Sequence, residues 1–117
     1  MLVFDVTALE ALFSSHPPVW ALLRRADQGL VRLAFPALTL IEAGTVLGVS
    51  AAVWEPFLWI PAVTVPPLSA AAAIEISTWP GTPGMRHALW EARHRHCPLV
   101  TRRPELYAPE TVDIQVV

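Results

Sequence analysis

Short apolar runs alternate along this chain with stretches that carry helix-start and helix-stop residues, and this alternation limits the fold more than any other feature. Alternating strands and helices are typical of α/β proteins, in which helices connect neighbouring strands of a parallel sheet. We therefore expect a single α/β domain over residues 1–117, with a mostly parallel central sheet of about five strands flanked by helices. The predicted strands are residues 2–5, 31–35, 62–65, 98–100 and 112–117.

Prolines and short polar residues mark the predicted helix ends. Proline fits the first turn of a helix, where its missing N–H would have no partner, and a serine or threonine side chain caps the free N–H groups there. Pro17, Pro36 and Pro83 therefore open predicted helices, and Ser69 caps another. The predicted helices are residues 7–13, 17–27, 37–47, 51–59, 70–79 and 83–96.

The chain is unusually apolar. Hydrophobic residues make up 54% of the sequence and charged residues 15%, against about a quarter in typical soluble domains. Five tryptophans add to this. Because so little polar surface is available, we expect a buried sheet and an apolar surface that meets a partner.

Residues 56–74 have no charged side chain, yet we predict no membrane span. Four prolines interrupt this stretch, whereas a spanning helix needs about 20 largely continuous apolar residues. The N-terminus lacks the basic and apolar regions of a secretory signal. The single Cys97, which is expected to lie in the core, agrees with a reducing compartment, so we predict a cytoplasmic protein.

Positive charge is concentrated near the C-terminus. The formal net charge of −2 argues against strong non-specific binding of nucleic acid by the whole chain. There is no lysine, and residues 86–103 hold five of the eight arginines, three histidines and a single acid, Glu91. His87 and His94 are interpreted as part of a solvated basic face, because cationic neighbours disfavour a metal site. Phosphate is the natural ligand of such a face, through Arg86, Arg93, Arg102 and Arg103.

Asp5 stands where the first predicted strand ends and a helix begins. Ligands of open α/β sheets bind at the carboxyl ends of the strands, so this position suits a functional carboxylate. The alternative is a structural role, in which Asp5 caps the following helix. Glu42 is the second candidate, since it lies within a predicted helix of apolar residues, where a lone buried acid would be costly without a partner.

Three segments, in this order and spacing, resemble PIN domains of the kind found in bacterial VapC-type toxins, and the resemblance covers essentially the whole chain. They are VFDVTAL at residues 3–9, PALTLIE at residues 36–42, and HALWEA at residues 87–92 leading into CPLVT at residues 97–101. The resemblance implies a metal-dependent endoribonuclease whose carboxylates hold Mg²⁺ or Mn²⁺ at the carboxyl edge of the sheet. Asp5 matches the first acid and Glu42 the second, while Thr7 and Thr101 match the supporting hydroxyl residues.

Two acids that this resemblance requires are replaced, one by Met85 and one by Arg103. Asp5 and Glu42 satisfy the minimum for one Mg²⁺ ion, whereas a two-metal clamp needs more carboxylates. Loss of one such catalytic group commonly costs about 10²- to 10⁴-fold in rate. We therefore expect ribonuclease activity to be weakened or lost.

Each replaced position has two interpretations. Arg103 either points inward, where its guanidinium would pair with Asp5 or Glu42 in place of a cation, or points to solvent. Met85 shares an apolar helical face with later residues, so a place in the core is favoured. Glu105 would supply a missing acid only if its loop folded back.

The family usually forms homodimers and binds an antitoxin protein across apolar grooves. Trp54, Phe57 and Trp59 are therefore candidates for an interface, although they would equally serve as core. Three functions stay open: a weakened Mg²⁺-dependent ribonuclease, a non-catalytic PIN-like module that binds RNA or a protein, and a structural α/β homodimer.

Overall fold

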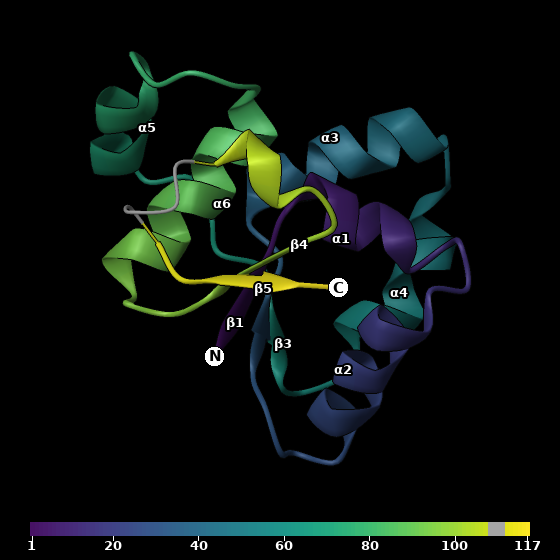
Figure 1. Ribbon diagram of the computed structural model, residues 1–117. Coiled ribbons are helices and arrows are strands. Elements are labelled where there is room, and N and C mark those ends of the chain that lie inside the picture. Colours follow the sequence, from purple (N-terminus) through teal and green to yellow (C-terminus); the bar gives the residue numbers. More distant parts are fainter. Residues whose placement is uncertain (108–111) are drawn as a thin grey trace.

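The computed structural model describes residues 1–107 and 112–117 and contains a five-stranded sheet in the order β3-β2-β1-β4-β5 (Figure 1). Every neighbouring pair of strands in this sheet is parallel. The predicted α/β class is therefore confirmed. The strands are β1 (Leu2–Phe4), β2 (Leu33–Ala34), β3 (Val63–Thr64), β4 (Leu99–Thr101) and β5 (Ile114–Val116).

Helices fill the connections between the strands, close to their predicted positions. Within residues 1–107 and 112–117, no helix is both long and apolar enough to cross a membrane. The helices are α1 (Val6–Ala11), α2 (Pro17–Asp27), α3 (Ala37–Leu47), α4 (Ala51–Leu58), α5 (Ala70–Ile76) and α6 (Pro83–His94), with a short 3₁₀ helix η1 (Pro104–Leu106) after β4.

Local sequence explains several helix ends. The side chains of Asp5, Ser69 and Thr82 each accept a hydrogen bond from a backbone N–H in the first turn of α1, α5 and α6. Gly48 ends α3 with a left-handed backbone (φ +65°), a conformation that costs glycine little. The predicted helix 70–79 is shorter in the structure, because α5 already ends at Ile76.

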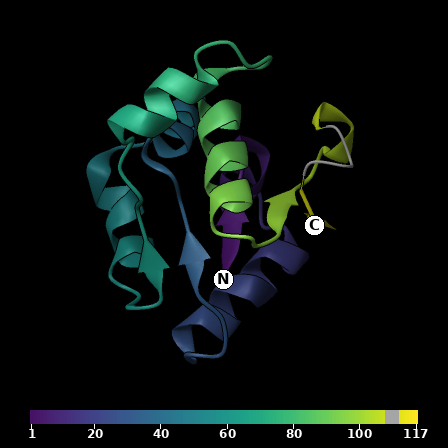
Figure 2. The ribbon, with the colours of Figure 1, turned by 90° about the vertical axis from the view of Figure 1, so that its left-hand side faces the viewer.

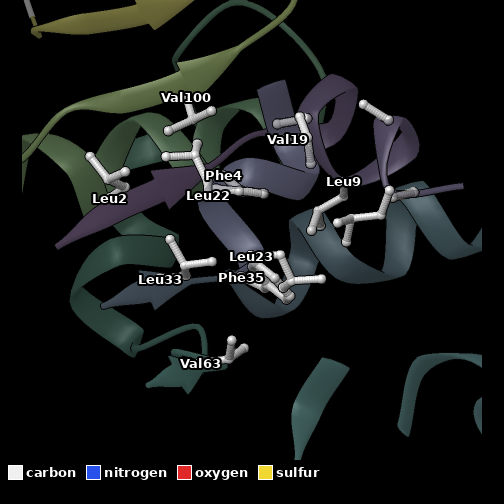
Figure 3. Packing of buried hydrophobic residues seen from close by; sticks show 14 of the residues in the cluster. Leu2, Phe4, Leu9, Val19, Leu22, Leu23, Leu33, Phe35, Val63 and Val100 are labelled. Carbon is white, nitrogen blue, oxygen red and sulfur yellow. The ribbon is translucent and has the colours of Figure 1, made fainter. Parts of the chain in front are cut away.

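Strand alternation divides the core between the two faces of the sheet. Leu2 and Phe4 of β1 pack with α1, α2 and α4 on one face, whereas Val3 packs beneath α6 on the other. Figure 3 shows the first cluster from close by, with Phe4 and Phe35 among its labelled side chains. Figure 2 shows α6 lying across the opposite face.

Strand order reverses between β1 and β4. From β1 the chain proceeds through β2 to β3 on one side, and it returns to the other side of β1 for β4 and β5. In such sheets the point where the order reverses is the usual ligand site. Asp5 follows β1 there, and Thr101 ends β4, so the two residues are neighbours across this point.

Candidate functional site

The Asp5 carboxylate is fully buried and accepts hydrogen bonds at both of its oxygens. Oδ1 accepts from the Ala8 backbone N–H (2.9 Å) and from the Thr7 hydroxyl (2.7 Å). Oδ2 accepts from the Tyr107 hydroxyl at 2.7 Å. The expected capping role of Asp5 is therefore confirmed, and its position at the carboxyl edge of the sheet is the predicted one.

Thr7 and Thr101 join the ends of β1 and β4. Their hydroxyl oxygens lie 3.1 Å apart, and because Thr7 gives its proton to Asp5, Thr101 is the donor in this contact. The backbone N–H groups of Arg102 and Arg103 donate to Thr7 Oγ1 (2.9 Å) and Thr101 Oγ1 (3.0 Å). Both threonines thus lie beside Asp5, as predicted, and hold the chain that leaves β4.

Glu42 ties α3 to the start of α6. Its Oε2 accepts from the Thr82 hydroxyl (2.6 Å), and its Oε1 accepts from the Gly84 backbone N–H (3.2 Å). Gly84 is buried, and a Cβ there would lie 2.9 Å from Val6 Cγ2 and 3.0 Å from Glu42 Cβ. The two helices therefore approach closely at a position that only glycine fits without movement of its neighbours.

Tyr107 is a site residue that the sequence analysis missed. Its side chain is buried (7% exposed), and its pKa is raised far above the ordinary value, first by burial and then by the charge of Asp5. The hydroxyl therefore stays protonated and remains a hydrogen-bond donor to Asp5. No spacing or motif in the sequence singled this residue out.

Glu10 is a second residue that the sequence analysis missed. Its pKa is raised, first by partial burial and then by the negative charges of Asp5 and Glu42, while Arg102 acts in the opposite direction. Three carboxyl groups therefore share one electrostatic environment at the carboxyl edge of the sheet. Even so, among the described residues no group of three His, Cys, Asp or Glu side chains is arranged to hold a metal ion.

The two replaced acidic positions have different surroundings. Met85 is half-buried and packs against the cluster that contains Ala88 and Leu99, so the interpretation as core is confirmed. Arg103 is 60% exposed at its side chain and donates from Nε to Glu105 Oε1 at 2.9 Å.

The hypothesis that Arg103 pairs with Asp5 or Glu42 is therefore wrong. The segment after β4 directs Tyr107, rather than Arg103, toward Asp5. Glu105 does not fold back either: it stays exposed, and its hydrogen bond with Arg103 lowers its pKa.

The predicted solvated face of histidines is wrong for His87, which is fully buried. Its Nδ1 accepts from the Leu38 N–H (3.2 Å), so Nε2 carries the proton and donates to Glu91 Oε1 (3.3 Å). Arg95 Nε donates to Glu91 Oε2 at 2.7 Å. Burial lowers the pKa of His87 despite the nearby Glu91 carboxylate, so the imidazole is a neutral core group.

The aromatic residues proposed as an interface have separate places. Trp54 is buried and Phe57 is half-buried, and both rings pack edge-on against Phe13, at 5.0 and 5.6 Å between centroids. Trp59 is 72% exposed. Trp54 and Phe57 are therefore mainly core, and only Trp59 is available at the surface.

The arginines assigned to phosphate lie in two places, at the carboxyl edge of the sheet and along α6. Arg102 and Arg103 directly follow β4 and are exposed. Arg86 and Arg93 lie on α6 and border a cavity of about 230 Å³, which Tyr107 and Met85 also line. The guanidinium of Arg93 lies 5.1 Å from the ring centroid of Trp79, a cation–π contact.

No protein-family model and no curated protein sequence matches this chain.

Proposed function

We propose that the chain is a PIN-like module resembling VapC-type toxins that binds RNA and has lost most of the metal-dependent cleavage implied by that resemblance. One observation carries the proposal. Every carboxylate oxygen of the two remaining acids, Asp5 and Glu42, accepts a hydrogen bond from the protein itself. Both groups thus act as structural acceptors that join separate elements of the fold.

These carboxylates do not fit a Mg²⁺ ion in this arrangement. The ion demands oxygen ligands at about 2.0–2.1 Å in near-octahedral geometry. At Oδ2 of the buried Asp5 the ion would compete with the Tyr107 hydroxyl, and at Glu42 it would compete with Thr82 and Gly84. Met85, at one of the two replaced acidic positions, has no oxygen atom in its side chain to bind the ion. We therefore assign no chemical step to a metal here.

Arginines at the carboxyl edge and along α6 support RNA as the partner. Arg86, Arg93 and Arg102 form no ion pair with a carboxylate within residues 1–107 and 112–117. Arginine is a common contact of phosphate oxygens in nucleic acids. Since Asp5, Glu10 and Glu42 would repel a phosphate, we expect the RNA backbone to follow the arginines beside the acids.

RNA binding is tested by fluorescence anisotropy with a short single-stranded RNA between about 50 and 200 mM salt. Replacing Arg102 and Arg103 together by Gln should weaken binding at low salt. The slope of the logarithm of the binding constant against the logarithm of salt concentration should fall by the equivalent of up to about two phosphate contacts. Arg24→Gln with Arg25→Gln is the matched control. These exposed arginines end α2, which packs on the opposite face of the sheet from α6.

Cleavage is tested with the same RNA in Mg²⁺ and in Mn²⁺. The wild type should not cleave above the level of Asp5→Asn. Metal-dependent cleavage by the wild type that disappears in Asp5→Asn would overturn the loss of catalysis. Equal, weak binding by the wild type and both arginine variants would overturn RNA as the partner.

A protein partner is the second candidate, because large apolar side chains are exposed on consecutive helices. Ile41 (64%) and Val46 (67%) lie on α3, and Trp59 (72%) caps α4. Exposed apolar groups of this size are common at protein interfaces. An antitoxin-like protein or a second copy would suit them, and Trp59→Ser should then weaken an association that light scattering detects.

A further inference from the structure

We propose that the cavity between α6 and η1 binds one nucleotide, with the base in the cavity and the phosphate on Arg86 and Arg93. The nucleotide is either free or part of single-stranded RNA, and for the second source the inference rests on the proposed function. The cavity has a volume of about 230 Å³. Pockets for drug-sized ligands are typically about 300–1,000 Å³, so a single base is the appropriate size of ligand.

The cavity walls suit a flat, apolar group. Met85 and Leu89 of α6, and Leu106 of η1, form aliphatic surfaces, and Trp79 and Tyr107 contribute aromatic ones. Bases stack on aromatic side chains with little dependence on sequence, since every base has a π face. The walls therefore favour a base over a sugar or a small inorganic ion.

Two cations at the cavity select an anionic ligand. Arg86 donates from Nε to the Gly81 carbonyl at 2.9 Å, which fixes the side chain and leaves its terminal N–H groups for another partner. Arg93 is held against Trp79 by the cation–π contact. Neither arginine pairs with a carboxylate among the described residues. Guanidinium groups bind phosphate through paired N–H groups, so the phosphate of a nucleotide matches them.

A neighbouring hollow of about 190 Å³ shares Trp79 and Arg93 with this cavity. Glu75 lines that hollow, but its carboxylate accepts from the Trp90 indole N–H at 2.8 Å and forms no ion pair with Arg93. Arg93 therefore forms no ion pair with the acid that shares this hollow.

Met85 connects this cavity to the altered acidic site. Its apolar side chain forms part of the cavity wall at the position where the resemblance requires an acid. Tyr107 lines the cavity and donates its hydroxyl to Asp5, so a bound base would lie beside the residue that contacts the Asp5 carboxylate. Replacement of the acid thus favours a base-binding cavity over a metal site.

Calorimetry with AMP, adenosine and inorganic phosphate tests the proposal on the full chain without added metal. AMP should bind more tightly than either of the other two. Arg86→Gln with Arg93→Gln should weaken AMP binding by about tenfold or more, as expected for the loss of charged hydrogen bonds. Leu89→Phe, which fills the cavity without changing charge, should weaken AMP and leave phosphate binding unchanged. Arg24→Gln with Arg25→Gln is the charge-matched control.

A short oligoadenylate in the same experiment separates the two sources of the nucleotide. Weaker binding of both AMP and RNA by the cavity variants supports the proposal for both. If the cavity variants leave the RNA affinity unchanged and AMP does not bind, the cavity site is overturned and the proposed RNA function stands. AMP binding that depends on the cavity, without RNA binding, supports a free-nucleotide site and overturns the RNA function. Phosphate that binds as tightly as AMP overturns the base site.

Discussion

Tyr107 donates its hydroxyl proton to Oδ2 of Asp5 across 2.7 Å, although the two residues are 102 positions apart in sequence. Both side chains are buried. The contact fixes η1 over the end of β1 and occupies the oxygen of Asp5 that no residue of α1 reaches.

Tyr107→Phe keeps the ring but leaves Asp5 Oδ2 buried without a hydrogen-bond donor. We expect a loss of about 1–3 kcal/mol in the free energy of unfolding, the usual cost of a buried polar group that lacks its partner. Urea denaturation followed by tryptophan fluorescence measures it. Arg103→Ala is the control, and it should leave the midpoint unchanged because Arg103 is exposed and, among the described residues, forms an ion pair with Glu105 alone. An unchanged urea midpoint for Tyr107→Phe would show that the Tyr107 hydroxyl contributes nothing to the stability of the fold.

Gly84→Ala should destabilise the fold by about 1–3 kcal/mol, because the new Cβ would lie 2.9 Å from Val6 Cγ2 and 3.0 Å from Glu42 Cβ. Gly44→Ala on α3 is the matched control. Its Cβ would meet Trp54 Nε1 at an ordinary 3.5 Å, and alanine favours a helix over glycine by about 0.8–1.0 kcal/mol. The melting temperature measured by thermal unfolding should therefore fall for Gly84→Ala and rise for Gly44→Ala. Equal shifts would contradict the close approach of α3 and α6.

Stability should fall in mild acid because of His87. Burial lowers its pKa in the folded protein below the ordinary 6.5, so the unfolded chain takes up the proton first. The stabilisation is complete above pH 6.5 and is lost as the pH falls toward the folded pKa, by at most about 1.4 kcal/mol per pH unit.

Denaturation at several pH values between 7 and 5 measures this loss. His87→Gln should flatten the dependence on pH, and His94→Gln, at an exposed position of α6, is the control. An equal slope in the wild type and His87→Gln would assign the acid sensitivity to other groups.

Trp54 and Trp59 should differ sharply when each is replaced by alanine. Trp54 is buried against Phe13, so its loss should cost about 3–5 kcal/mol of unfolding free energy. Trp59 is exposed, and its loss should change stability by less than about 0.5 kcal/mol. Chemical denaturation of dilute protein compares them. A large loss for Trp59→Ala that depends on protein concentration would instead indicate that a second copy covers this residue.

Local sequence was sufficient for three residues at the strand ends. Asp5, Thr7 and Thr101 lie next to apolar runs, and parallel strands bring their carboxyl ends to one edge, so their proximity was predictable. Tyr107 was not predictable, because its contact with Asp5 depends on how the chain turns after β4 rather than on any periodicity.

The histidines show where charge misled the prediction. Arg86, Arg93 and Arg95 share a segment with His87 and suggested a solvated face, but the helical period decides the position of this residue. His87 and Glu91 are four residues apart, and Ala88 and Ala92 follow them at the same spacing. That pattern marks the buried side of α6, and it was the signal available for finding the pair.

The order β3-β2-β1-β4-β5 also has a consequence for synthesis on the ribosome. β1 is made first, yet it lies in the middle of the sheet and needs both β2 and β4 as neighbours. Until residues 99–101 leave the exit tunnel, one edge of β1 has no strand to pair with. Asp5 Oδ2 also lacks the Tyr107 hydroxyl as its hydrogen-bond donor at that stage. A nascent or truncated chain that ends before β4 therefore exposes an open, apolar strand edge, and such edges favour aggregation.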